Sequence, residues 1–297
     1  FYYICEMKKF PSIEQFRHVI RHVKVNHDFK GVGENGDAVY RHDSPYPTLT
    51  FTGTVKIHGT NAAIVKHSSG EIQYQSRENV LSLTKDNAGF FLYMKSIEDR
   101  INELFSLPFT DHMAIYGEWC GGNIQKGVAI NGVDKMFVIF GIKVDDVWVE
   151  LQPHIQDNPK NIYNILQFPT YEIDIDFNTP ELSQNKLIEM TIAVEECCPV
   201  GKFFDKEGIG EGIVFTCTTN QDLKFKSKGE KHSVTKVKTL NAIDVESVES
   251  INGFVESVVS ENRLKQGISF FNENNIAVES KNTGEFLRWI VTDVLKE

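Results

Sequence analysis

Strand-like and helical segments interleave along the first 238 residues without the regular strand–helix–strand order that builds a parallel sheet. β-Branched and aromatic residues alternate with polar ones over residues 49–75, 113–119 and 136–148, and two short stretches follow within 211–226. Such alternation is typical of antiparallel strands that bury one face. The pattern therefore favours an α+β fold over a doubly wound α/β sheet.

Three segments of the same region have helical spacing. Apolar side chains recur every three or four residues over residues 10–24, 90–107 and 182–197, which predicts helices that pack on the strands. Within residues 49–75, Gly53, Gly59 and the Ser-Ser-Gly run at 68–70 interrupt the alternation. We interpret that region as a hairpin of two strands.

The composition and periodicity of the chain change near residue 239. From there to residue 297 it carries ten acidic and five basic residues, with helical periodicity over 252–266 and 283–296. We predict two domains, a larger one at residues 1–238 and a small helical one at 239–297.

The net charge restricts the binding partners. Lys and Arg number 31 against 41 Asp and Glu, a formal charge of −10, which excludes a protein that coats nucleic acid indiscriminately. Any site for a polyanion must be a local basic patch. One such stretch exists, because six lysines fall within fifteen residues whose only acid is Glu230: Lys224, Lys226, Lys228, Lys231, Lys236 and Lys238.

The cysteine spacing and the hydropathy of the chain indicate in which cellular compartment it is expected. The five cysteines show no CxxC and no Cys/His spacing of a zinc site, so we expect reduced thiols in the cytoplasm or another reducing compartment. The longest apolar run, residues 136–142, is too short to cross a bilayer, and no membrane association is expected. The sequence starts at Phe1, which leaves an N-terminal targeting segment open.

The segment KIHGTN, residues 56–61, places a lysine at the end of a predicted strand and a glycine three residues later. Glycine allows a backbone to approach a ligand closely. An isolated lysine of this kind is more often a solvated surface residue. Its significance depends on four further segments in order: YGEW at 116–119, FVIFG at 137–141, EGIV at 211–214 and LKFK at 223–226.

Together these five segments resemble the ordered motifs of covalent nucleotidyltransferases, the superfamily of polynucleotide ligases and capping enzymes. KxHGxN is similar to the phage RNA ligase 2 family, which includes RNA-editing ligases, whereas DNA ligases and capping enzymes typically have Asp where His58 stands. The resemblance covers about residues 50–238. It implies a nucleotidyltransferase domain of ATP-grasp-like antiparallel sheets with helices, followed by a small helical domain that engages RNA.

The resemblance also implies roles for individual residues. Lys56 would be the nucleophile that carries AMP, and His58 would assist AMP transfer to RNA or make an orienting hydrogen bond. Glu118 would accept hydrogen bonds from the ribose, and Glu211 would bind the α-phosphate through Mg²⁺. The other candidate contacts to the nucleotide or its phosphates are Ile57, Asn61, Arg77, Phe140, Lys224 and Lys226.

Several of these positions have a second interpretation. Phe140, expected to stack on adenine, lies in a wholly apolar segment and would serve equally as a core residue. Arg77 could form a surface ion pair with Glu78 or Glu71 instead of contacting the nucleotide. Where the family often has an acidic residue before the lysine, this chain has Val55, so only a backbone contact to adenine is expected there.

We therefore predict an ATP-dependent RNA ligase that uses ATP and Mg²⁺ to seal 5′-phosphate and 3′-hydroxyl RNA ends. The expected substrate is a nick in duplex RNA. The expected biological role is RNA repair or editing. The second candidate is an mRNA capping guanylyltransferase, which normally has a β-barrel after the last motif. The third is a non-catalytic RNA-end-binding protein that kept the fold. The sequence names no protein partner.

Overall fold

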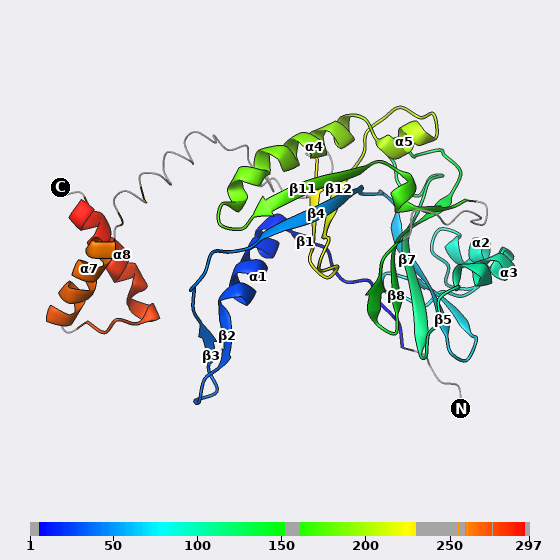
Figure 1. Ribbon diagram of the computed structural model, residues 1–297. Coiled ribbons are helices and arrows are strands. Elements are labelled where there is room, and N and C mark those ends of the chain that lie inside the picture. Colours follow the sequence, from blue (N-terminus) through cyan, green and yellow to red (C-terminus); the bar gives the residue numbers. More distant parts are fainter. Residues whose placement is uncertain are drawn as a thin grey trace. The chain divides into compact units, whose positions relative to one another are not determined.

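The computed structural model describes residues 6–151, 161–229, 255, 259, 261–274 and 276–294 (Figure 1). The chain divides into two compact units, residues 1–241 and 242–297. In the described part, no helix is both long enough and apolar enough to span a bilayer.

Two sheets form the first unit. The first has the order β1 (Glu14–Gln15), β13 (Lys224–Lys228), β12 (Gly212–Cys217), β4 (Thr48–Val55) and β11 (Thr170–Asp176). The second has the order β10 (Ile162–Asn164), β8 (Met136–Val144), β7 (His112–Cys120), β5 (Thr60–His67) and β6 (Ile72–Ser76), with β9 (Val147–Val149) paired to β8. Neighbouring strands are antiparallel except β1 on β13 and β10 on β8. The predicted α+β fold with antiparallel sheets is confirmed.

Helices α1 (Phe16–Asp28) and α4 (Gln184–Glu196) cover one face of the first sheet (Figure 1). On α1, the ring of Phe16 lies 5.0 Å from that of Phe225, and on α4, Oγ1 of Thr191 lies 2.6 Å from Oγ of Ser227. Phe225 and Ser227 alternate along β13 with three lysines. Because alternate side chains of a strand point to opposite faces, the lysines point away from both helices.

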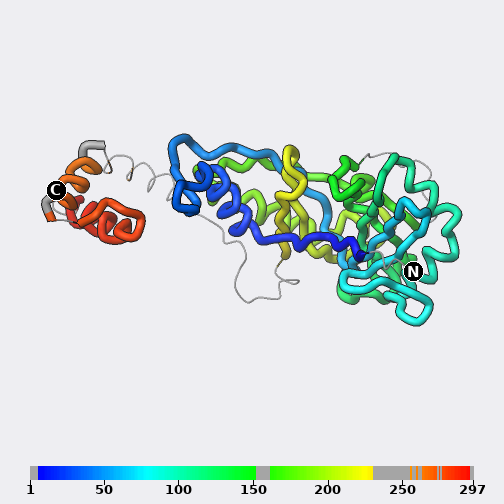
Figure 2. Tube along the Cα trace, turned by 90° about the horizontal axis from the view of Figure 1, so that it is seen from below, coloured from blue at the N-terminus to red at the C-terminus, as the bar shows by residue number. Residues whose placement is uncertain are grey.

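Helices α2 (Phe90–Ser96) and α3 (Glu98–Ile101) and the short η1 (Asn102–Leu104) pack on one face of the second sheet. Phe90, Met94 and Ile101 share a buried cluster with strand residues that include Ile64 and Trp119. On the opposite face, Phe10 packs in a smaller cluster with β-strand residues. The segment before α1 thus runs from the second sheet to the first, where residues 14–15 pair with β13 (Figure 2).

Three short helices complete this unit: η2 (Ile165–Gln167), η3 (Pro180–Ser183) and α5 (Pro199–Phe203). A separate two-stranded hairpin, β2 (Phe29–Val32) and β3 (Ala38–Tyr40), follows directly after α1.

The prediction of one two-stranded hairpin over residues 49–75 is wrong. β4 belongs to the first sheet, whereas β5 and β6 form a hairpin in the second, so residues 56–59 cross between the sheets. Alternation shows that a segment is a strand but not which strand it pairs with. The first predicted helix also begins late, at Phe16, because residues 14–15 pair with β13.

In the second unit, α7 (Glu261–Glu273), η5 (Ser280–Asn282) and α8 (Thr283–Val294) are the described elements. Phe271 of α7 is buried with its ring 5.3 Å from that of Phe286 on α8. Nε of Arg263 lies 2.9 Å from Oδ2 of Asp293, a second link between the helices. Most of residues 252–260 lie outside the described residues, so the start of the first predicted helix there is not described.

Candidate functional site

A cavity opens where the two sheets of the first unit meet. Its volume is about 610 Å³, including the space open to solvent. Strands β4, β12 and β13 line it from the first sheet, and β5, β7 and β8 line it from the second. The predicted site residues that line this cavity are Lys56, Ile57, Asn61, Glu118, Phe140 and Lys224.

The loop at residues 56–59 is fixed at both of its ends. The backbone N–H of Lys56 donates to the carbonyl of Gly212 on β12, at 2.8 Å. At the other end, the N–H of Gly59 donates to Oε1 of Glu118 at 3.2 Å, and the side chain of Gln125 donates to the Gly59 carbonyl at 3.1 Å. The nucleophile candidate therefore sits on a short segment held by both sheets.

Gly59 has a steric reason to be glycine. A Cβ atom at this position would lie 2.4 Å from the carbonyl oxygen of Trp119 on β7. The close approach predicted for this glycine is thus made to the backbone of a neighbouring strand. Only glycine lets the loop come near enough for its N–H to reach Glu118.

Glu211 is surrounded by two lysines and a histidine. Its Oε2 atom is 2.7 Å from Nζ of Lys56 and 3.0 Å from Nδ1 of His58, and its Oε1 atom is 2.6 Å from Nζ of Lys228. Only 2% of the Glu211 side chain is exposed. Burial by itself would raise the pKa of Glu211, but the hydrogen bonds from His58 and Lys228 and the charge and hydrogen bond of Lys56 outweigh it and hold the pKa well below its usual range. The carboxylate is therefore ionised at neutral pH.

Glu118 pairs with Asn61 across strands β5 and β7, and its pKa is shifted in the opposite direction to that of Glu211. Burial raises the pKa of Glu118 to about 7, although the charge of Lys56 and the hydrogen bond from Gly59 act in the other direction. Two carboxyl groups of the same site thus differ in protonation near neutral pH. This is the arrangement in which one stays an anion and the other can both donate and accept hydrogen bonds.

The three lysines of β13 lie on the face of the first sheet opposite α1 and α4, the face that carries the site. Nζ of Lys224 lies 4.6 Å from the centre of the Trp148 ring, and burial lowers the pKa of Lys224 to about 8. Burial and the neighbouring charge of Lys228, together with those of Lys56 and Arg77, lower the pKa of Lys226. Within residues 6–151 and 161–229, Lys226 has no acidic side chain at salt-bridge distance, which suits it to an anionic ligand.

Arg77 and Phe140 can now be placed. Arg77 is exposed, does not line the cavity, and donates to Oγ of Ser12 at 3.0 Å. The alternative ion pair with Glu78 is not formed, because Glu78 pairs with Lys9 at 2.7 Å. Phe140 is half-buried: it lines the cavity and also meets the ring of Phe10 edge-on at 4.9 Å. Phe140 therefore packs against the core and faces the cavity, and its stacking on adenine stays a prediction.

A second, smaller cavity of about 210 Å³ shares Val55, Lys56 and Ile57 with the first. His58 and Glu211 line it together with apolar side chains that include Val200 and Ile209. Lys56 therefore lines both cavities.

Sequence reasoning missed Lys228 as a partner of Glu211 and grouped it with the basic stretch that could bind a polyanion. The signal was present, because Lys224, Lys226 and Lys228 are spaced by two residues and must share one face of a strand. The remaining lysines of that basic stretch, Lys231, Lys236 and Lys238, lie outside the described residues. The acidic residues Glu172, Asp174 and Asp176 are exposed on the edge strand β11.

Comparison with known proteins identifies a family and similar folds. A family model described as RNA ligase matches residues 49–238, and no curated protein matches the chain. Among solved structures, a mutant RNA ligase of Naegleria gruberi with ATP and Mn is similar, with 17% identity and a TM-score of 0.50 over 76% of this chain and 57% of that one. The same ligase with PPi gives 18% and 0.49 over the same shares. This chain thus spans less than two thirds of those structures, and the likeness concerns the fold.

Proposed function

Because this chain belongs to the RNA ligase family, we propose that it is an ATP-dependent RNA ligase that acts through a lysyl-AMP intermediate on Lys56. The observation that carries this proposal is the position of Lys56. Its Nζ atom lies 2.7 Å from an ionised, buried glutamate, and Lys56 lines both cavities on a loop that both sheets hold. A nucleophile fixed in this way loses little freedom when substrate binds.

In the first step, the lone pair of the Lys56 amine attacks the α-phosphorus of ATP. A P–N bond forms, the bond from the α-phosphorus to the bridging oxygen breaks, and pyrophosphate leaves with the electron pair. The amine must first give up a proton, which we assign to solvent because the low pKa of Glu211 makes it a weak base. Lys224 and Lys226 would stabilise the charge that develops on the phosphates.

In the second step, a 5′-phosphate oxygen of RNA attacks the same phosphorus and the P–N bond breaks while its nitrogen takes up a proton from solvent, so that AMP moves to the RNA end and Lys56 regains its amine. In the third, the neighbouring 3′-hydroxyl attacks the 5′-phosphorus, loses its proton, and AMP departs. We assign His58 to the second step because it shares Oε2 of Glu211 with Lys56 and lines the smaller cavity.

The remaining cavity residues would hold the nucleotide. Phe140 would stack on adenine, Glu118 would contact the ribose, and Ile57 and Asn61 would complete the cavity wall. Arg77 would reach the phosphates only by leaving Ser12. A nick in duplex RNA is the substrate that we propose, with the second unit engaging the RNA.

The donors at this site fit Mg²⁺, which prefers carboxylate oxygens. Glu211 would hold the ion, and because its two oxygens already contact Lys56, His58 and Lys228, the ion would replace part of these contacts. When bound, Mg²⁺ would neutralise charge on the transferring phosphate.

The described helices of the second unit, α7 and α8, favour a ligase over a capping guanylyltransferase, for which a β-barrel is expected after the last motif. One experiment separates the three candidates. Protein is incubated with α-labelled ATP or GTP and Mg²⁺ and then denatured. We expect retained label from ATP only; label from GTP would indicate capping, and label from neither would indicate the binding protein.

A further inference from the structure

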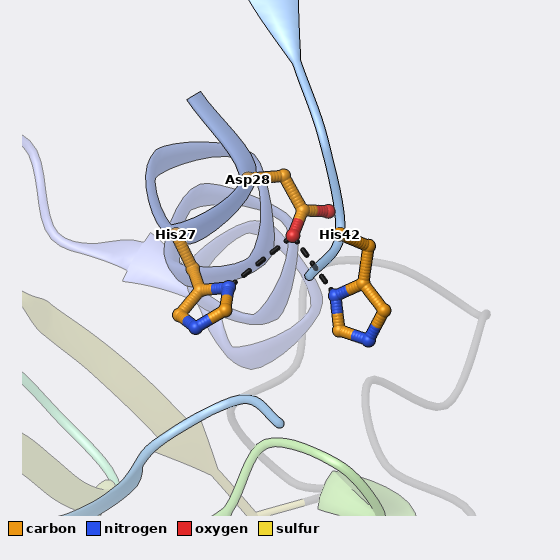
Figure 3. Close-up of side chains that lie close together, drawn as sticks. All are labelled: His27, Asp28 and His42. Atoms are coloured by element: carbon orange, nitrogen blue, oxygen red, sulfur yellow. Dashed lines mark hydrogen bonds and ion pairs between the residues drawn. The ribbon is translucent and has the colours of Figure 1, made fainter. Parts of the chain in front are cut away.

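A second cluster of metal-binding side chains lies at the end of α1. His27 and Asp28 are the last two residues of the helix, and His42 follows β3, the second strand of the adjoining hairpin (Figure 3). None of the three lines either cavity described above. In the described part of the chain, this is the one group of three His, Cys, Asp or Glu residues close enough to share an ion.

The three donor atoms converge. Nδ1 of His27 lies 3.2 Å from Oδ1 of Asp28, and Nδ1 of His42 lies 3.0 Å from the same oxygen, as the dashed lines of Figure 3 show. Zn²⁺ binds nitrogen and oxygen at about 2.0–2.2 Å, so two ligands of a tetrahedral site are separated by about 3.4 Å. The observed separations are close to that value, and small side-chain movements would admit the ion.

Outer contacts orient two of these side chains. Nε2 of His27 lies 3.2 Å from Oγ of Ser44, and the hydroxyl of Tyr46 donates to Oδ2 of Asp28 at 3.0 Å. Metal-binding histidines and carboxylates are typically held in this way through the atom that does not face the ion. The backbone adds a further constraint, because the N–H of Arg41 donates to the carbonyl of Asp28 at 2.7 Å and brings His42 back to the helix end.

We propose that His27, Asp28 and His42 form a binding site for a divalent transition-metal ion, Zn²⁺ in the first instance, with water as the remaining ligand. Two imidazole nitrogens and one carboxylate oxygen suit Zn²⁺, whereas Mg²⁺ prefers oxygen donors alone. The C-terminal end of a helix also carries partial negative charge, which favours a cation there. The ion would join the hairpin β2–β3 to helix α1.

The alternative is a hydrogen-bonded cluster that binds no ion. Zinc titration of the chelator-stripped full chain, followed by calorimetry in millimolar Mg²⁺, distinguishes the two. We compare wild type with His42→Ala, an exposed ligand, and with His18→Ala, an exposed histidine of the same helix outside the cluster. We expect one Zn²⁺ per chain in wild type and in His18→Ala, and binding weaker by at least about 100-fold in His42→Ala. Equal Zn²⁺ affinity in the two variants would overturn the proposal, as would a wild type that binds none.

Two further measurements distinguish loss of Zn²⁺ binding from loss of folding. Tyr46→Phe keeps all three ligands but removes the hydrogen bond to Asp28, so we expect Zn²⁺ affinity to fall by about tenfold. Zn²⁺ should raise the melting temperature of wild type and not that of His42→Ala. Because none of these residues lines the cavities of the Lys56 site, lysyl-AMP formation should be the same in both proteins, which separates this test from that of the proposed ligase function.

Discussion

Nζ of Lys228 lies 2.6 Å from Oε1 of Glu211, while Lys56 and His58 contact the other oxygen of the same carboxylate. The pairing follows from strand register, because Lys228 is directly opposite Gly212, the residue after Glu211. Glu211 is therefore shared between a residue that we assign to catalysis and one that we assign to support.

Removing this support should weaken the protein. In Lys228→Ala, Oε1 of a carboxylate that is 2% exposed loses its cation, so the free energy of unfolding should fall by about 1–3 kcal/mol. Urea denaturation measures this change, with the exposed Lys202→Ala on α5 as control. If both variants are equally stable, Lys228 does not support Glu211.

Lys56→Ala should abolish lysyl-AMP formation, because no other group would carry the nucleotide. The variant should still seal RNA that already carries AMP at its 5′ end, since that step does not need the lysine as carrier. Both reactions are measured on gels, with the exposed Lys95→Ala of α2 as control. Normal amounts of protein-bound AMP in Lys56→Ala would show that another residue is the nucleophile.

Glu118 should give the protein a specific pH dependence. The pKa of Glu118 is about 7 in the folded protein against 4.5 for a free side chain, so between these values the folded state holds the proton more strongly. Its contribution to the free energy of unfolding should therefore fall as pH rises through this window, by at most about 3 kcal/mol. The difference between wild type and Glu118→Gln, measured in urea from pH 4.5 to 8, isolates this contribution. A difference that does not change with pH would contradict the assignment.

The two units should divide the reaction between them. All residues of the two cavities lie in the first unit, so a fragment of residues 1–241 that melts cooperatively should still form lysyl-AMP. AMP transfer to a nicked RNA duplex should fall steeply, because we assign RNA engagement to the second unit. The two steps are timed separately for the full chain and the fragment. Equal sealing rates would place the RNA site wholly in the first unit.

Within the second unit, the residues differ in what they can offer to RNA. Arg263 pairs with Asp293 and so links α7 to α8. Arg288 is exposed on α8. We therefore expect Arg288→Ala to slow AMP transfer without loss of stability, and Arg263→Ala to lower the melting temperature.

The sequence predicted the strand and helix types well because alternation and helical spacing are local. It also indicated all six of the cavity residues named above, because each belongs to one of the five short motifs. What it could not predict depended on pairing between distant segments. Neither the change of sheet at residues 56–59 nor the approach of Lys228 to Glu211 follows from spacing alone. His27 and His42, fifteen residues apart, meet only because the hairpin between them folds back on the helix.

The loop at residues 56–59 has a mechanical consequence. Lys56 is bonded through its backbone to the first sheet and Gly59 to the second. Any change in the angle between the sheets must therefore alter the backbone of this four-residue segment. The residue that we propose as the nucleophile thus lies on a connection that would act as a hinge, and the reach of the Lys56 amine would depend on how far the cavity is open.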